Sequence, residues 1–358
     1  MQIPRGTLRT PLPLTGSWLS SFVGSYAVRT IVQALITVFA VVTFTFFLVR
    51  LMPGNPIDVY VTQLVNQENL TYEDAYRRAA SQFSFNPDAS VFSQYLDYLS
   101  GVVRGDLGTS ITSTGTQVSA QILRFLPWTV FCVGLGLLCS FVLGMALGIV
   151  TAYRRNSFLD TSISFFAAVL SAVPDYIWGL LILVVFGVQL QWFSIGDLRG
   201  TYDPRVTPGF NSPFLWSALT HAALPILVYV MGTLGGWVLN MRSSTTSVLG
   251  EDYVNVARAR GLSQGRIVTS YVGRNAALPL FTLLAINIGL VIGGSVIIEE
   301  LFVYKGLGSF LAASIQKRDY TAMQGVFLVI TIAVVVANVL ADLLYSRLDP
   351  RVRVSGDK

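Results

Sequence analysis

Three consecutive segments decide the fold. Residues 223–241 read ALPILVYVMGTLGGWVLNM, residues 277–298 read ALPLFTLLAINIGLVIGGSVII, and between them residues 251–268 read EDYVNVARARGLSQGRIV. Each outer segment is apolar over about 20 residues, the length that crosses ~30 Å of hydrocarbon as a helix. The middle segment is polar and helix-prone. This order predicts two membrane spans joined by a polar loop that has a role of its own.

The composition extends this interpretation to the whole chain. Of the 358 residues, 53% are hydrophobic and 12% are charged, and the mean hydropathy is +0.61. Soluble domains have roughly 25% charged residues. We therefore predict an all-α integral membrane protein with six transmembrane helices, the third kinked at Pro174. The six apolar runs are 29–51, 127–153, 160–190, 221–242, 276–298 and 323–346.

The distribution of basic residues predicts the topology. If both termini are cytoplasmic, that side has 14 of the 24 basic residues in about 80 positions, and the other side has 9 in about 130. The first run is too long for a signal-peptide core, so we expect an uncleaved first span. The predicted order is a cytoplasmic segment 1–28, a first transmembrane helix 29–51, an extracytoplasmic subdomain 52–126, a core of five transmembrane helices 127–346 with a cytoplasmic loop 243–275, and a cytoplasmic tail 347–358.

Two helices are expected in the extracytoplasmic subdomain. Residues 71–83 begin with Thr71 and Asp74 at the spacing of a capping box, and residues 93–103 have apolar side chains at helical spacing. At the N-terminus, residues 18–28 are compatible with a short helix lying on the membrane surface and equally with a frayed terminus.

Reactive side chains are scarce. Cys132 and Cys139 lie about 10.5 Å apart along a helix, too far for a disulfide, so we interpret them as packing thiols. The single histidine, His221, cannot form a His-x-x-x-His zinc pair, and we expect it to be structural and interfacial. The sequence has neither a Gly-Lys dipeptide, which a Walker A loop needs, nor a Gly-x-Ser-x-Gly elbow. We expect no catalytic, cofactor-binding or metal-binding residues and no nucleic-acid partner.

Small and amide side chains mark the spans. Glycine pairs four residues apart allow close helix packing in lipid, although glycine is also common in membrane helices. Amide side chains within or near the spans either hydrogen-bond between helices or line a path for polar cargo, since carboxylates are few there. The glycines are Gly144 and Gly148, Gly232 and Gly236, and Gly289 and Gly293, and the amides are Asn240, Asn287 and Asn338.

The polar loop resembles the cytoplasmic EAA loop of binding-protein-dependent ABC importer permeases. Ala257, Gly261 and the pair Leu278–Pro279 match that pattern, whereas Asn255 and Val256 replace its Glu and first Ala. The form EDYVxxARARGLS…RNAALP is similar to B-type permease subunits of the oligopeptide/dipeptide branch. Lys305 departs from that branch, in which a proline often precedes Gly-Leu-Gly. Further matching fragments are LVRLMPGNP (48–56), RGDLGTS (104–110), LPWT (126–129), EELFVYKGLG (299–308), RDYTAMQG (318–325) and DLLYSRLDPRVR (342–353).

This resemblance implies a type I ABC importer permease fold in a bacterial or archaeal cytoplasmic membrane. It implies four partners: a homologous second permease, two ATPase subunits that hold ATP and Mg, and an extracytoplasmic peptide-binding protein. The loop would be the helix that couples to an ATPase. Ala257 and Gly261 would give it a close-fitting face, and the acidic residues would lie at its N-terminal end. On composition alone, a solvated basic loop is the alternative. The residues assigned to coupling are Glu251, Asp252, Asn255, Val256, Ala257, Arg258, Ala259, Gly261 and Leu262.

Other cargo and other classes remain open at this point. Members of the same branch import nickel chelates or oligosaccharides. A secondary carrier or channel would work without ATPase partners, and a membrane enzyme would need reactive residues that the sequence lacks.

Overall fold

The computed structural model describes residues 26–51, 61–62, 64–66, 70–82, 90–113, 115–291 and 296–348. Gly293, the tail after residue 348 and most of the predicted surface helix 18–28 lie outside this part of the chain. Within it, the only bridge-type pairing is an isolated one between Thr109 and Gln117. The described chain is otherwise helices and their connections.

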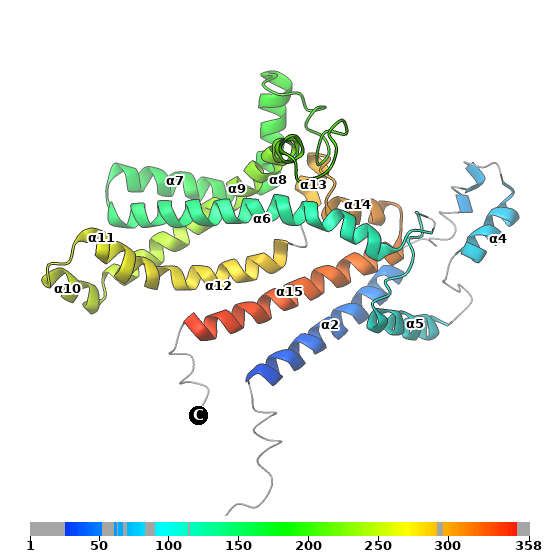
Figure 1. The fold of residues 1–358 in the computed structure, drawn as a ribbon, viewed down its shortest axis with the longest axis horizontal. Helices are drawn as coiled ribbons and strands as arrows, with labels where there is room; N and C mark the ends of the chain where they lie inside the picture. The colour runs from blue at the N-terminus through cyan, green and yellow to red at the C-terminus, as the bar shows by residue number, and fades with distance from the viewer. Residues whose placement is uncertain are drawn as a thin grey trace, which may run out of the picture.

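Five helices are long and apolar enough to cross a membrane, and a bent pair makes up a sixth span. The prediction of an all-α membrane protein with six spans is therefore confirmed. In Figure 1 the spanning helices lie side by side, with α10 at one end of the bundle and α14 and α5 at the other. The five helices are α2 (Tyr26–Arg50), α6 (Val118–Tyr153), α9 (Ser212–Leu249), α12 (Arg274–Val291) and α15 (Tyr320–Leu348).

The third apolar run is broken, not gently kinked. It forms α7 (Phe158–Ala172), α8 (Asp175–Leu181) and the π-helical η1 (Ile182–Gln189), with a bend of 97° between α7 and the second part. Pro174 disfavours helical backbone at the residue before it, and Val173 is accordingly extended, with φ −98° and ψ 125°. Figure 1 shows α8 turning away from the direction of α7.

Several predicted boundaries were wrong. The helix α6 begins at Val118, nine residues before the apolar run, because Val118 and Ile122 are buried against α14 (Leu307–Gln316) and α15. The predicted fifth span ends early, since α12 stops at Val291 and a separate helix, α13 (Val296–Leu301), contains its last residues. The connection 243–275, in which a coupling helix was expected, is mostly helical. It contains the end of α9, α10 (Asp252–Ala259), α11 (Gln264–Arg266), the π-helical η2 (Ile267–Gly273) and the start of α12.

The two helices expected between the first and second spans are present. The first, α4 (Tyr72–Gln82), is preceded by Thr71, whose Oγ1 accepts a hydrogen bond from the Asp74 amide at 3.3 Å. The second, α5 (Val91–Arg104), is capped by the Ser90 side chain, which accepts from the Ser93 amide. Both caps use the side-chain oxygen of a residue just before the helix to satisfy a free N–H group.

A close helix contact at two successive turns joins α6 to α9. A methyl group added to Gly144 would collide with the Trp237 side chain, and one added to Gly148 would lie 2.6 Å from Met241 Cβ and 2.7 Å from the Val238 carbonyl oxygen. These two positions therefore pack directly on α9, as their spacing suggested.

The other glycine pairs behave differently. A methyl group on Gly232 would lie 2.6 Å from Asp175 Cβ at the start of α8, but one on Gly236 would meet nothing within 4 Å. The residue that packs on α7 is Gly235 instead, beside the Ala167 carbonyl. Gly289 approaches α15 at Val334 Cα, with a distance of 3.0 Å from the added methyl carbon. Of the pair Gly232 and Gly236, only Gly232 therefore makes a close contact with another helix of this chain.

Matched alanine substitutions test the α6–α9 contact. We expect Gly148→Ala to lower the thermal unfolding temperature of the purified protein, because overpacking costs about 1–3 kcal/mol. Gly236→Ala should be neutral or slightly stabilising, since alanine favours a helix by roughly 1 kcal/mol over glycine. An equal response of the two variants would show that the α6–α9 contact is not tight.

Candidate functional site

The polar loop forms a short helix, α10, which packs against one end of the bundle. The helices α6 and α9 end at the same place. Within α10, Val254 and Ala257 are buried in one apolar cluster with Ile267 and Val272 of η2. Tyr153 at the end of α6 packs on the same cluster, as do Val248 and Leu249 at the end of α9. The helix is therefore attached to three other elements of its own chain.

Backbone geometry fixes where α10 ends. The Gly261 amide donates to the Arg258 carbonyl at 2.9 Å, and the Leu262 amide donates to the Ala257 carbonyl at 3.3 Å. This pair of bonds is a Schellman motif, which needs a left-handed residue just after the helix, and Gly261 has φ +74°. Glycine adopts that conformation without steric cost.

Two details of the predicted docking face are corrected by this geometry. Ala257 is only 2% exposed and faces its own bundle, so its small side chain serves the internal contact with η2. Gly261 is exposed, and its identity is explained by its backbone conformation. The two residues do not form one outward face.

A different set of side chains is exposed along α10. Tyr253 is 39% exposed and Val256 is 51% exposed, one helical turn apart. Ala259 continues this stripe by the same spacing. Charged and polar groups flank it and are also exposed: Glu251, Asp252, Asn255, Arg258 and Arg260.

A charged contact braces the neighbouring helices. Arg242 of α9 donates to both carboxylate oxygens of Asp160 in α7, at 2.7 and 3.0 Å. Asp160 also accepts from the Asn156 amide and the Ser164 hydroxyl. Its side chain is 4% exposed and fully hydrogen-bonded, which a buried carboxylate requires. This bidentate bridge ties α7 to α9 close to the turn that enters α7.

Within the described residues, no hydrogen bond joins the three predicted amides to one another. Asn240 and Asn287 donate to carbonyls of their own helices, Gly236 and Leu283, at 2.9 and 2.7 Å. Asn240 and Asn338 are exposed. Their part in a cargo path remains a prediction. His221 lies inside α9, where it is buried with Nδ1 2.7 Å from the Ser217 carbonyl oxygen.

At the opposite end, a buried carboxylate joins two of the motifs found in the sequence. Glu299 of α13, only 1% exposed, accepts a hydrogen bond from the Thr129 hydroxyl of α6 at 2.7 Å and from the Ser309 amide of α14 at 2.9 Å. Thr129 Oγ1 in turn accepts from the Leu307 amide at 2.7 Å. Burial raises the pKa of Glu299, against the lowering effect of these donors. The fragments LPWT and EELFVYKGLG therefore form a single junction.

A second carboxylate joins two further motifs, RGDLGTS and RDYTAMQG. Asp319, 1% exposed, receives hydrogen bonds from the Ser110 hydroxyl and from the amide and hydroxyl of Thr112, the last two at 3.1 and 3.0 Å. Its other oxygen accepts from the Ala322 amide at 3.0 Å and caps α15. RGDLGTS is thereby fixed to the start of RDYTAMQG.

The four motifs are recognisable in the sequence, but the roles of Thr129, Glu299, Ser110 and Asp319 were not predicted from it. The signal was present: Glu299 and Asp319 are acidic residues directly beside apolar runs, where an unpaired charge is costly. What the sequence did not reveal was the partner of each carboxylate, which lies 170 or more positions away in the chain.

No group of three or more His, Cys, Asp or Glu residues suited to a metal ion occurs in the described ranges. A helical membrane bundle with a polar helix at one end and motif junctions at the other has the form of a transport subunit. Residues 144–354 match the family described as binding-protein-dependent transport system inner membrane component, and the chain belongs to this family.

Named relatives are similar over nearly the whole chain. The di/tripeptide transport system permease protein DppB of Pseudomonas aeruginosa is 31% identical over 92% of this chain and 98% of its own length. The oligopeptide transport system permease protein AppB of Bacillus subtilis is 29% identical over 92% and 99%. The dipeptide transport system permease protein DppB of Escherichia coli K12 is 29% identical over 88% and 95%.

The Glu299 junction can be tested by removing one hydroxyl. We expect Thr129→Val to destabilise the purified protein by about 1–3 kcal/mol, since it leaves the Leu307 amide unpaired and takes a donor from a buried carboxylate. Thermal unfolding measures the effect. Thr331→Val is the control, because that hydroxyl donates only to the Phe327 carbonyl of its own helix. Equal unfolding temperatures for both variants would contradict the role of the junction.

Proposed function

We propose that this chain is one of the two transmembrane subunits of an ATP-driven importer of peptides. The observation that carries the proposal is the exposed stripe of α10, presented at one end of a bundle whose family is that of binding-protein-dependent transport. The names of the relatives favour di- and oligopeptides over nickel chelates or oligosaccharides as cargo. A channel or secondary carrier would have no use for such a docking helix.

The proposed partners follow from this role. Two cytoplasmic ATPases bind ATP and Mg, a homologous second permease completes the path, and an extracytoplasmic binding protein delivers the peptide. This chain contributes no covalent chemistry in the proposal. It lies in the cytoplasmic membrane of a bacterium or archaeon.

In the proposed mechanism, ATP binding closes the ATPases and moves α10. Because Val254 and Ala257 are packed against η2 and the ends of α6 and α9, displacement of α10 moves these helix ends with it. The Arg242–Asp160 bridge extends the same displacement to α7. The bundle then opens outward to the loaded binding protein, and hydrolysis resets it inward.

The orientation of the bundle is part of the proposal. Both the start of α2 and the end of α15 point toward the α10 end, and α5 lies at the other end (Figure 1). We expect an impermeant thiol reagent on intact cells to label a cysteine introduced at the exposed Ser100 of α5, but not one at the exposed Ser263 beside α10, in a chain without Cys132 and Cys139. Labelling only at position 263 would invert the topology.

The docking role of α10 is tested at its most exposed apolar residue. Val256→Glu places a charge in a contact that excludes water, so we expect binding of the ATPase to weaken by about tenfold or more, corresponding to ~1.4 kcal/mol. Binding-protein-stimulated ATP hydrolysis and peptide uptake by reconstituted transporter should fall together.

Gln264→Glu is the matched control, because Gln264 is exposed in the same segment but lies outside α10. It should retain hydrolysis and uptake. If Val256→Glu behaves like this control, α10 is a solvated loop helix and does not receive the ATPase.

A further inference from the structure

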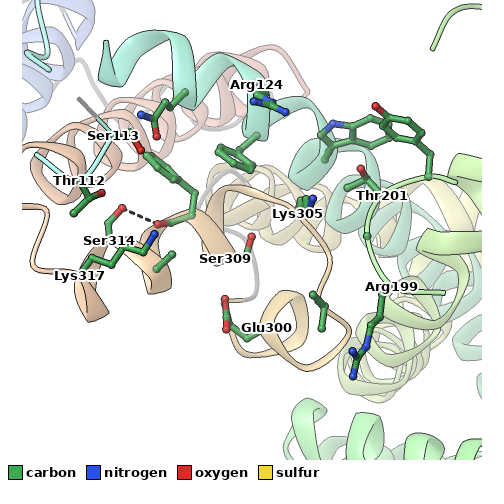
Figure 2. A pocket seen from close by; sticks show the side chains of 18 of the residues that line it. Thr112, Ser113, Arg124, Arg199, Thr201, Glu300, Lys305, Ser309, Ser314 and Lys317 are labelled. Carbon is green, nitrogen blue, oxygen red and sulfur yellow. Dashed lines mark hydrogen bonds between the residues drawn. The ribbon is translucent and has the colours of Figure 1, made fainter. Parts of the chain in front are cut away.

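The outer end of the bundle contains a cavity that the proposed coupling mechanism does not use. Its volume is about 870 Å³, within the ~300–1,000 Å³ typical of sites for small ligands. It lies between the first turns of α6, the connection between η1 and α9, and α14 with the residues before it. Figure 2 shows the side chains of these segments around it.

The side chains that line the cavity have an excess of positive charge. Arg124, Arg199, Lys305 and Lys317 line the cavity against a single carboxylate, Glu300, which makes four positive groups to one negative. Among the described residues, no carboxylate lies within 4.0 Å of any of the four cations. In Figure 2, Lys317 and Arg199 lie on opposite sides, with Lys305 and Arg124 between them.

Nearby Arg205 shows the contrast. It pairs with Asp203 at 2.7 Å outside the cavity, and its hydrogen bonds hold the pKa of Asp203 at about 2. Arg205 is therefore an arginine near the cavity whose charge is already compensated by a carboxylate.

Two pairs of aromatic rings form an apolar part of the wall. Trp128 stacks on Tyr202 with ring centroids 5.5 Å apart, and Phe125 stacks on Phe310 at 5.0 Å. Each pair joins α6 to another segment of the lining. The hydroxyls of Ser309 and Ser314 also line the cavity. Ser309 donates to the Gly306 carbonyl at 2.8 Å, and Ser314 donates to the Phe310 carbonyl at 2.7 Å, as drawn in Figure 2. Because both hydroxyls already donate, their oxygens remain as acceptors for N–H groups.

We propose that this cavity is a receiving site for the free carboxylate of a peptide, its C-terminus or an acidic side chain. The inference rests on the proposed function and deepens it by naming the group recognised. Cations supply charge-assisted hydrogen bonds to the carboxylate, the aromatic walls cover the chain beside it, and the serine oxygens accept from peptide N–H groups. Every unmodified peptide has a C-terminal carboxylate, so such a site selects peptides as a class and not a particular sequence.

Lys305 and Arg124 are the cations that the test addresses. Lys317 follows the last residue of α14, where a basic group also stabilises the helix end, so its charge has a second explanation. Lys305 lies in the connection between α13 and α14 and Arg124 on an exposed part of α6. Neither has a hydrogen bond or ion pair within the described chain that would explain its presence.

The experiment measures protection of an introduced cysteine. Ala313→Cys, in a chain carrying Cys132→Ala and Cys139→Ala, places a thiol on the cavity lining from α14. The complete transporter, without nucleotide or binding protein, is treated with a neutral maleimide and the labelling rate is followed by mass spectrometry. The two probes are N-acetyl-trialanine, which has a carboxylate and no ammonium, and trialanine amide, which has the reverse.

We expect the carboxylate probe to halve the labelling rate at a concentration about three- to tenfold lower than the amide does, the range of partly exposed charge-assisted contacts. Lys305→Gln and Arg124→Gln should each reduce this preference, and added salt should weaken it. Arg205→Gln, an extracytoplasmic arginine outside the cavity, should leave it intact.

Equal protection by both probes, protection by neither, or an unreactive introduced cysteine would overturn the carboxylate site. The same would follow if Arg205→Gln removed the preference as fully as Lys305→Gln. ATP-driven peptide uptake, measured on the same reconstituted transporter, separates the two claims. Uptake without selective protection refutes only the cavity, whereas no ATP-driven uptake refutes the proposed function whatever the labelling shows.

Discussion

The close approach of α6 and α9 is the contact on which the rest of the bundle depends. Because Gly144 and Gly148 of α6 have no side chains, Trp237 and Met241 of α9 pack directly against the α6 backbone. In lipid, where apolar side chains gain little by leaving the solvent, such close packing is a main source of helix association. The contact sets the separation of the two helices, and so positions their last turns, where Tyr153 and Leu249 form the support for α10.

The two ends of the bundle are stabilised by different kinds of interaction. At the α10 end an apolar cluster joins four elements, and a single bidentate ion pair braces α7. At the outer end the buried carboxylates of Glu299 and Asp319 join segments that are far apart in the chain, through short hydrogen bonds to hydroxyl and amide donors. Buried polar networks of this kind are costly when incomplete, so they hold one arrangement strongly. We interpret the outer junctions as the fixed frame around the cavity and the α10 end as the part on which the ATPases act.

The sequence predicted the class of fold well because membrane spans depend on length and hydropathy, which are local properties. It also predicted α4, α5 and a distortion at Pro174, where capping residues and a proline act on their own neighbours, although the predicted kink is a break of 97°. It failed where tertiary contacts decide. The extension of α6 to Val118 depends on burial against α14 and α15, and α13 and α14 are too short to give a span-like signal.

The candidate site shows the same division. The position of α10 was predicted, but which of its faces points outward was not. Small residues suggested an external contact through Ala257, whereas the cluster with Ile267 and Val272 turns that side inward. Gly261 is explained by the Schellman hydrogen bonds that end the helix. In the sequence, a glycine needed for its backbone conformation cannot be distinguished from one needed for close packing. The apolar exposed residue Val256, by which the loop departs from the EAA pattern, became meaningful only when the buried face was known.

The central claim is that α10 and the end of α9 move as one body when the ATPases close. The most direct measurement is the distance between spin labels introduced at Asn255 on α10 and Ser243 on α9, both exposed, in complete transporter with and without ATP under conditions that block hydrolysis. We expect the same distance distribution between positions 255 and 243 in both states, and a changed distribution for a pair joining Asn255 to Ser100 on α5. A shift between positions 255 and 243 on ATP binding would show that α10 moves independently of the bundle, and would contradict the account.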